Sequence, residues 1–252
     1  MQPINEMVNI HSEKWTVFYN KVNVEQIKGY DLIIIESEHY SLKEITFLKA
    51  NNATVLGYFS LSELNINHLQ FHSQSHLLFE KHKNWDSYYL DITDKKYRDY
   101  ARKQMISSLE KGVDGLFFDN IDNTSPWGIF KGQEDLLLSV IRDIKNEYPF
   151  IKLLINGGIW MHKKIAALTL GWFVESLFTR YDFVHQKTIA RCKSEFSAAV
   201  EQLHAISKPY DLPVYLIEYC SPELLAEFNP HLPSHWNLEC LPIHLNYQYA
   251  IG

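Results

Sequence analysis

Short apolar runs that end in a polar or acidic residue recur along this 252-residue chain. Runs of about four to eight apolar residues bounded by turn signals are typical of buried strands. We expect eight strands, in the segments WTVFYN, DLIIIE, TVLGYFS, SYYLD, DGLFFD, KLLIN, WFVESL and PVYLIEY.

Helical periodicity fills the stretches between these runs. From Tyr97 to Lys111 the apolar residues gather near one face, and Gly112 follows as a stop signal. Gln133 to Tyr148 shows the same pattern and ends before Pro149. Because strands and helices alternate, we predict a parallel sheet, and the chain length favours a single closed (β/α)8 barrel over an open doubly wound sheet.

One domain is expected over residues 1–252, with its barrel core at residues 15–220, because no Pro-, Gly- or Ser-rich linker divides the chain. LPIHLNYQYA, from Leu241 to Ala250, reads as a ninth extended segment. It would add an edge strand, cover the barrel, or replace a strand that we counted wrongly. No run of eighteen apolar residues is present, which excludes a membrane-spanning helix.

The segment VDGLFFDNIDN, residues 113–123, places Asp119 at the end of a strand and two polar side chains, Asn120 and Asp122, just after it. Glu175 occupies the same relative position in WFVESL. In parallel α/β proteins the carboxyl ends of the strands carry the chemistry, so we predict that Asp119 and Glu175 lie in one site. A lone Asp here would more simply cap a helix. Asp122 is either a groove residue or such a cap.

Charge and composition narrow the class of partner. The net charge of −6 and the pI near 6.0 argue against nucleic acid, which requires a basic surface. Aromatic residues form 14% of the chain, and several lie near the strand-end acids, where they suit sugar rings or simply pack in the core. They are Tyr19, Tyr58, Trp85, Trp127, Trp160 and Tyr219.

Other kinds of site are weakly supported. His68, His72 and His76 would share a helix face with metal-ligand spacing, but no carboxylate lies among them, and a solvated helix or loop explains them as well. No GxSxG elbow is present, and Asn156-Gly157-Gly158 reads as a turn more readily than as an anion site. Three cysteines without CxxC spacing argue against a disulfide framework. We therefore expect neither metal nor cofactor.

The ordered motifs DLIIIE, GYFSLSE, NWDSYYLDITD, GVDGLFFDNIDN, LLINGG, FVESLF and PVYLIEYC together resemble glycoside hydrolase family 114, which contains endo-α-1,4-polygalactosaminidases. The resemblance spans residues 15–220. It implies a (β/α)8 retaining endo-glycosidase acting on α-1,4-linked galactosamine or N-acetylgalactosamine polysaccharide, with Asp119 and Glu175 as its catalytic pair. Further positions resemble substrate-groove residues: Glu36, Tyr58, Glu63, Asp91, Asn120, Asp122, Asn156 and Glu218. With the aromatic residues Tyr19 and Tyr219, they are the expected substrate-binding residues.

Two positions depart from the family pattern. Ser60-Leu61-Ser62-Glu63 stands where the family has Ser-x-Gly-Glu, and Glu218 stands where it has Asp. The alternatives are therefore a barrel that binds carbohydrate without cleaving it, or a glycosidase for another glycan. The first fifteen residues lack the basic start and apolar segment of a secretory signal, which favours the cytoplasm, although the resembling family is mostly secreted. The pattern predicts no oligomeric state.

Two carboxyl groups suit glycoside hydrolysis because one must protonate the leaving oxygen while the other stays ionised. Asp119, beside Asn120, is the better candidate for the ionised nucleophile. Glu175, among apolar neighbours, better suits the protonated acid, although the reverse assignment stays open. Retention requires a carboxyl separation of about 5–5.5 Å, and inversion one of about 6.5–9.5 Å.

Overall fold

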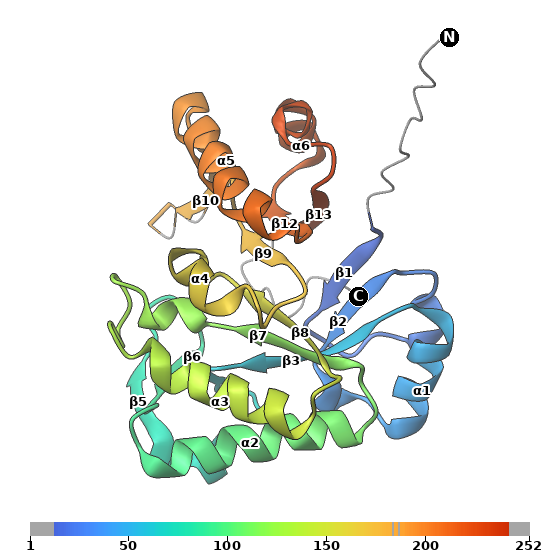
Figure 1. Ribbon diagram of the computed structural model, residues 1–252, viewed down its shortest axis with the longest axis vertical. Helices are drawn as coiled ribbons and strands as arrows, with labels where there is room; N and C mark the ends of the chain where they lie inside the picture. The colour runs from blue at the N-terminus through green and yellow to red at the C-terminus, as the bar shows by residue number, and fades with distance from the viewer. Residues whose placement is uncertain (1–12, 183, 186, 242–252) are drawn as a thin grey trace.

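Eight parallel strands form one curved sheet in the computed structural model, which describes residues 13–182, 184–185 and 187–241. Their order around the sheet is β1 (Trp15–Phe18), β2 (Leu32–Ile35), β3 (Val55–Ser60), β7 (Gly115–Asp119), β8 (Lys152–Asn156), β9 (Trp172–Glu175), β12 (Val214–Tyr219) and β13 (Asn237–Leu241). The sheet curls until β13 comes back beside β1 (Figure 1). This nearly closed, single-domain barrel confirms the predicted (β/α)8 class.

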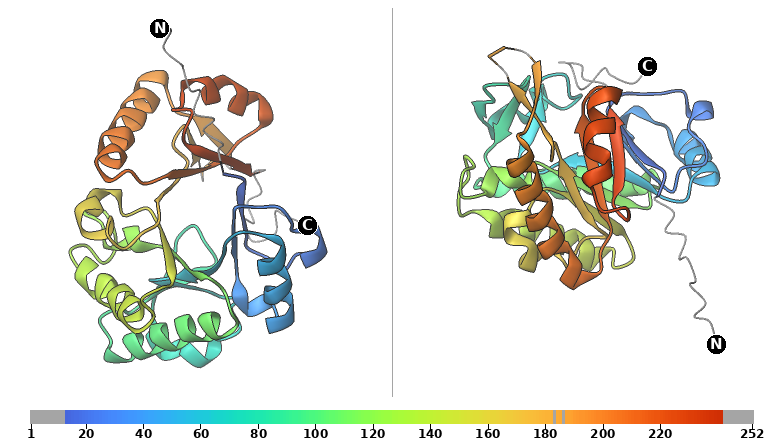
Figure 2. Two further views of the ribbon diagram at one scale, coloured as in Figure 1. Left: turned by 45° about the vertical axis from the view of Figure 1, so that its right-hand side comes forward. Right: turned by 90° about the horizontal axis from the view of Figure 1, so that it is seen from above.

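Six α-helices lie around the outside of these strands in the described residues (Figure 2). The helices predicted from Tyr97 and from Gln133 are confirmed as α2 and α3, which run side by side. Asp94 caps α2, and Gly112 follows that helix with φ +93°. The six are α1 (Leu42–Asn51), α2 (Lys95–Glu110), α3 (Glu134–Glu147), α4 (His162–Ile165), α5 (Lys193–Ser207) and α6 (Pro222–Phe228).

The core has two layers because strands such as β7 bury both faces. Phe117 of β7 points into the barrel, where it meets Phe173 edge to face, with ring centroids 4.7 Å apart. Its neighbours Leu116 and Phe118 face outward and pack in the layer between strands and helices. A strand buried on both sides reads as a continuous apolar run, which is why the sequence pattern identified β7.

The prediction that SYYLD forms a strand of the barrel is wrong. Ser87–Leu90 forms β6 of a separate antiparallel sheet with β4 (Glu63–Asn65) and β5 (Leu78–Lys81), inserted between β3 and α2. The apolar character of SYYL marks a strand but does not say which sheet the strand joins. The eighth barrel position belongs to β13, which the sequence analysis missed because Asn237 and Glu239 interrupt its apolar run.

The barrel therefore extends past the predicted core limit at residue 220. The predicted ninth segment starts at Leu241, the last residue of β13, and its residues 242–250 lie outside the described part of the chain. A hairpin of β10 (Thr179–Asp182) and β11 (Lys187–Ala190) follows β9. Within the described residues, no helix has the length and apolar character that crossing a bilayer requires.

Candidate active site

Three adjacent strands end in the polar residues of the site. Asp119 is the last residue of β7, Asn156 the last of β8 and Glu175 the last of β9. These strands are neighbours in the sheet, so their carboxyl ends meet at the same edge of the barrel. Asp114 precedes β7 at the opposite end, where it accepts a hydrogen bond from the Val55 backbone and pairs with Lys49. This position fits the turn role expected from the sequence.

Asn156 joins the two acids through a single nitrogen. Its Nδ2 donates to Asp119 Oδ1 over 2.9 Å and to Glu175 Oε1 over 2.6 Å. Both carboxyl groups therefore face the same space above β8. The structure thus brings the two residues predicted as a catalytic pair into direct contact with a common partner.

Asp119 accepts two further hydrogen bonds. Tyr58 Oη donates to its Oδ2 over 2.7 Å, and the Asn120 backbone N–H donates to its Oδ1 over 2.7 Å. Asn120 adopts a left-handed conformation, with φ 62°, and its side chain donates to Ser60 Oγ over 2.9 Å. With the bond from Asn156, Asp119 thus accepts hydrogen bonds from three donors.

Glu175 lies in a different environment. Burial, together with the charge of nearby Asp119, raises the pKa of Glu175 to about 7, even though hydrogen bonds from Tyr219 and Asn156 act to lower it. Tyr219 Oη is the donor at 3.0 Å from Glu175 Oε2. The site therefore holds Asp119, which is surrounded by three hydrogen-bond donors, and Glu175, whose carboxyl group keeps its proton up to near-neutral pH.

Three tyrosines surround this pair. Burial and the neighbouring carboxylates raise the pKa of Tyr19, Tyr58 and Tyr219 well above the usual range. They stay neutral and can act as hydrogen-bond donors at any physiological pH. Tyr19 and Tyr58 also meet edge to face, with ring centroids 5.8 Å apart.

A cavity of about 1020 Å³ opens over the strand ends. Asp119 and Glu175 line it together with most of the predicted groove residues. These are Tyr19, Glu36, Tyr58, Glu63, Asn120, Asp122, Asn156 and Tyr219.

Two predicted groove residues, Asp91 and Glu218, are not part of this lining. Asp91 accepts hydrogen bonds from the backbone and hydroxyl of Thr93 in a turn. Glu218 is fully buried and accepts from Phe178 N over 2.9 Å and from Thr179 Oγ1 over 2.7 Å. Glu218 thus holds the segment that follows Glu175, and burial raises its pKa to about 7.

Asp122 and Glu63 hold loops as well as lining the cavity. Asp122 Oδ1 accepts from Gly158 N over 2.9 Å and from Trp160 Nε1 over 3.0 Å. Asp122 was expected to be either a groove residue or a helix cap. In the structure it lines the cavity, and its two hydrogen bonds fix the turn after β8. Glu63, near the start of the inserted sheet, accepts from Ser87 and from Asn123.

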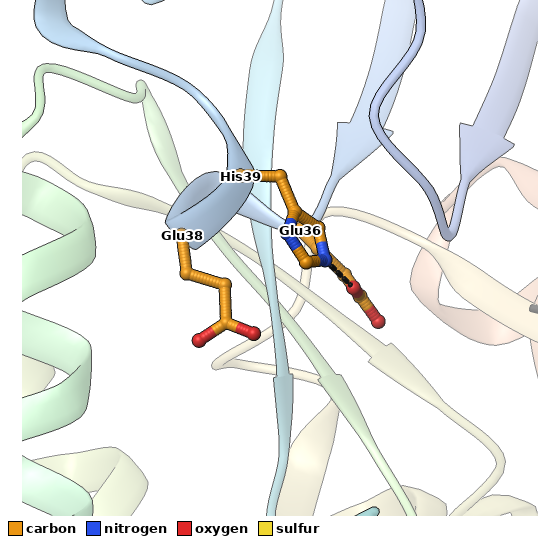
Figure 3. Close-up of side chains that lie close together, drawn as sticks. All are labelled: Glu36, Glu38 and His39. Atoms are coloured by element: carbon orange, nitrogen blue, oxygen red, sulfur yellow. Dashed lines mark hydrogen bonds and ion pairs between the residues drawn. The ribbon is translucent and has the colours of Figure 1, made fainter. Parts of the chain in front are cut away.

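Glu36, just before the 3₁₀ helix that follows β2, forms a cluster with Glu38 and His39 of that helix (Figure 3). Each offers one potential metal-ligand atom, and these atoms lie within 4.8 Å of one another. Two ion pairs account for the arrangement: His39 Nε2 lies 2.6 Å from Glu36, and His68 Nε2 lies 3.1 Å from Glu38. The hydrogen bond to Glu36 raises the pKa of His39, which favours an ion pair over metal ligation.

The helix face of histidines that a metal site would require does not form. His72 to Leu77 is a short 3₁₀ segment with a break at Gln74, so the spacing of four residues no longer places imidazoles one above another. His68 instead reaches Glu38 at the cavity. The segment is not α-helical, so the metal-site alternative loses its spacing, and the preferred interpretation, a solvated segment, fits this conformation.

Apart from Trp85, which was named as an aromatic residue suited to sugar rings, the sequence analysis missed two parts of the cavity wall. One is a face of α2 and the residue after it, and the other is the turn between β5 and β6. Neither stands at the end of a barrel strand, so the strand-end pattern gave no signal for them. The residues are Tyr100, Gln104, Ser107, Ser108 and Lys111 from the helix region, and Lys81 to Ser87 from the turn.

The model of glycoside-hydrolase family GH114 matches residues 3–233 of this chain. The chain belongs to this family. The predicted resemblance is thereby confirmed over nearly the whole sequence. A comparison with curated protein sequences found no match.

Solved structures support the same fold at low sequence identity. The glycoside hydrolase domain of PelA from Pseudomonas aeruginosa is 17% identical, with a TM-score of 0.76, and the match covers 93% of this chain and 96% of that one. Aspergillus fumigatus Ega3 in complex with galactosamine is 14% identical, with a TM-score of 0.71 and coverage of 93% and 92%. A Thermus thermophilus α-galactosidase is 11% identical, with a TM-score of 0.55 and coverage of 90% and 57%.

Proposed function

We propose that this GH114 protein is a retaining glycoside hydrolase that cleaves within α-1,4-linked galactosamine or N-acetylgalactosamine chains. Asp119 and Glu175 are its catalytic pair. The observation that carries the proposal is the contact of both carboxylates with Asn156 Nδ2. The similar Ega3 structure, a complex with galactosamine, supports the choice of sugar.

The separation of the acids favours retention. The two hydrogen bonds to Asn156, 2.9 and 2.6 Å long, limit the distance between Asp119 Oδ1 and Glu175 Oε1 to at most about 5.5 Å. Retaining pairs stand about 5–5.5 Å apart, whereas inverting pairs leave about 6.5–9.5 Å for a water molecule. The geometry therefore favours direct attack by a carboxylate.

Asp119 is assigned as the nucleophile. Its carboxylate attacks the anomeric carbon while the bond to the leaving oxygen breaks, and Glu175 donates its proton to that oxygen. Water then attacks the anomeric carbon of the glycosyl–Asp119 ester, Glu175 takes the proton from the water, and Asp119 leaves as a carboxylate. The three donors on Asp119 and the raised pKa of Glu175 match these roles.

The remaining cavity residues are proposed to bind the chain. Tyr58, Asn156 and Tyr219 donate hydrogen bonds to the two acids, and Tyr19 lies close enough to both acids to feel their charge. Glu36 offers a carboxylate to a sugar hydroxyl or ammonium group. Glu63, Asn120 and Asp122 line the wall beyond β3 and β7. A polymer substrate suits the cavity because its volume lies at the upper end of the roughly 300–1,000 Å³ that drug-sized ligands occupy.

The test measures product release from partially deacetylated α-1,4-galactosaminogalactan by the wild type, Asp119→Asn and Glu175→Gln. We expect activity in the wild type and a loss of about three orders of magnitude or more in both variants, because each removes a group that reacts directly. Thermal melts show whether the variants are folded.

The anomeric form of the first product, followed by NMR, tests retention separately. Saturable binding without release would identify a carbohydrate-binding barrel instead. Activity on another glycan that needs both acids would keep the mechanism and correct the substrate. Full activity in either folded variant would contradict the catalytic pair.

A further inference from the structure

The cavity continues from the catalytic pair to the turn between β5 and β6. Residues 82–86, here called the outer turn, line its far end together with Lys81 and Ser87. We propose that the outer turn forms a distal subsite, in which Trp85 binds an uncharged, N-acetylated sugar unit of the polysaccharide that is cleaved at the acid pair. This inference rests on the proposed function.

The inserted sheet is fixed relative to the catalytic strand. Glu63 of β4 accepts from Ser87 Oγ, beside the outer turn, over 2.7 Å. Its other oxygen accepts from Asn123 Nδ2, in the loop after Asp119, over 2.9 Å. Glu63 is 8% exposed, so these bonds are shielded from water. A sugar unit bound at the outer turn would therefore lie at a fixed distance along the polysaccharide from the bond that is cleaved.

The outer turn is itself held in one conformation. His82 Nδ1 accepts from the backbone N–H groups of Asn84 and Trp85, each over 3.1 Å. The His82 ring lies roughly parallel to that of Trp85, at 29° and 6.3 Å between centroids, and it also contacts Tyr89. A preorganised aromatic side chain binds a ring ligand at little entropic cost.

The residue types of the outer turn suit a pyranose. Trp85 is half-buried in the cavity wall, and exposed Lys83 and Asn84 offer donors to sugar hydroxyl and acetamide oxygens. Aromatic faces bordered by a few polar groups are typical of ligand sites of this kind.

Charge selects the uncharged form of the sugar. Lys81 lies 3.9 Å from Asp86, whereas Lys83 forms no ion pair in the described part of the chain. The ammonium group of Lys83 repels a protonated galactosamine but accommodates an acetylated one. The inner part of the cavity differs, because Glu36, Asp119 and Asp122 line it.

The test compares wild type, Trp85→Ala, Trp85→Leu and the control Trp127→Ala on partially acetylated and on fully deacetylated α-1,4-galactosaminogalactan. Trp127 is 84% exposed and lies outside the cavity lining. Both Trp85 variants should lower kcat/KM on the acetylated polymer by about tenfold, through KM, because the lost contact serves ground state and transition state alike. On the deacetylated polymer the change should stay below about twofold.

The other possible outcomes contradict the proposed function, the subsite or its preference for an acetylated sugar. If the wild type releases nothing from either polymer, the proposed function fails and the subsite fails with it. If the wild type is active and both Trp85 variants match Trp127→Ala, only the subsite fails. An equal loss on both polymers overturns the assignment to an acetylated unit. Trp85→Leu keeps a bulky apolar side chain, so its kinetics test the subsite if Trp85→Ala has a low Tm.

Discussion

Asp119 and Glu175 differ in the hydrogen bonds that they accept, and individual contacts shift the pKa of Glu175. Asp119 receives three hydrogen bonds, whereas burial and the Asp119 charge favour the protonated form of Glu175. Tyr219 opposes this effect, because its hydroxyl donates to the Glu175 carboxylate and lowers the pKa of Glu175. Tyr219 therefore adjusts the pH range in which Glu175 can donate a proton.

The pH dependence of Tyr219→Phe tests this balance. As an acid, Glu175 must hold its proton, so wild-type kcat/KM should fall as the pH rises through about 7. Removing the Tyr219 hydroxyl raises the pKa of Glu175 further, so the fall should move to higher pH, by up to about one unit. The pH profile of kcat/KM measures the shift.

The control for this variant is Tyr215→Phe, which removes a phenol whose partner is Glu13 rather than an active-site acid. Its pH profile should match that of the wild type. A shift of the Tyr219→Phe profile to lower pH, or no shift, would sink the assigned role of this hydrogen bond.

At the scale of elements, the turn after β8 links both sides of the site. Gly157 and Gly158 have φ of +72° and +68°, which are left-handed conformations that glycine adopts without strain. A Cβ on Gly157 would overlap the carboxylate of Asp122, which accepts from the Gly158 N–H. The prediction that the glycines form a turn is confirmed, but their contact with Asp122 depends on the tertiary structure.

Gly157→Ala should destabilise the protein more than Gly132→Ala does. Gly132 has a similar φ of +77°, but a Cβ there meets nothing within 4 Å, so only the backbone cost of about 1–2 kcal/mol applies. The overlap with Asp122 should lower the free energy of unfolding by at least about 1 kcal/mol more. In a chain of this size each kcal/mol lowers Tm by about 2–4 °C. Equal Tm losses in the two variants would contradict the predicted contact.

The whole molecule depends on joining the first strand to the last. The Glu13 backbone N–H, just before β1, donates to Asn237 Oδ1 of β13 over 2.8 Å, and Tyr215 Oη of β12 donates to the Glu13 carboxylate. Asn237 is 4% exposed. These contacts connect segments separated by more than 200 positions, and they bring β1 and β13 together at the seam of the barrel.

Asn237→Ala should weaken this seam. Removing the acceptor leaves the Glu13 N–H without its partner, which should cost about 1–2 kcal/mol of unfolding free energy. Denaturant unfolding measures the loss, with Asn67→Ala as the control, because Asn67 is an exposed loop residue. If the two variants were equally stable, the hydrogen bond between Glu13 and Asn237 would contribute nothing to closure.

The amino-acid sequence by itself determined the class of fold and the acid pair. Strands buried on both faces show as apolar runs, and the residue that ends such a run must lie at the carboxyl edge of a parallel sheet. For this reason Asp119, Asn156 and Glu175 could be placed before any coordinates were known.

Only the tertiary structure decided which strands share the barrel and which side chains meet. Ser87–Leu90 forms part of an inserted sheet, and Asn237–Leu241 closes the barrel, because pairing depends on partners far away in the sequence. The bridge from Asn156 to both acids, the burial of Glu218 and the position of Trp85 have the same origin. Local patterns report burial and periodicity, whereas these contacts arise from the folding of distant segments onto one another.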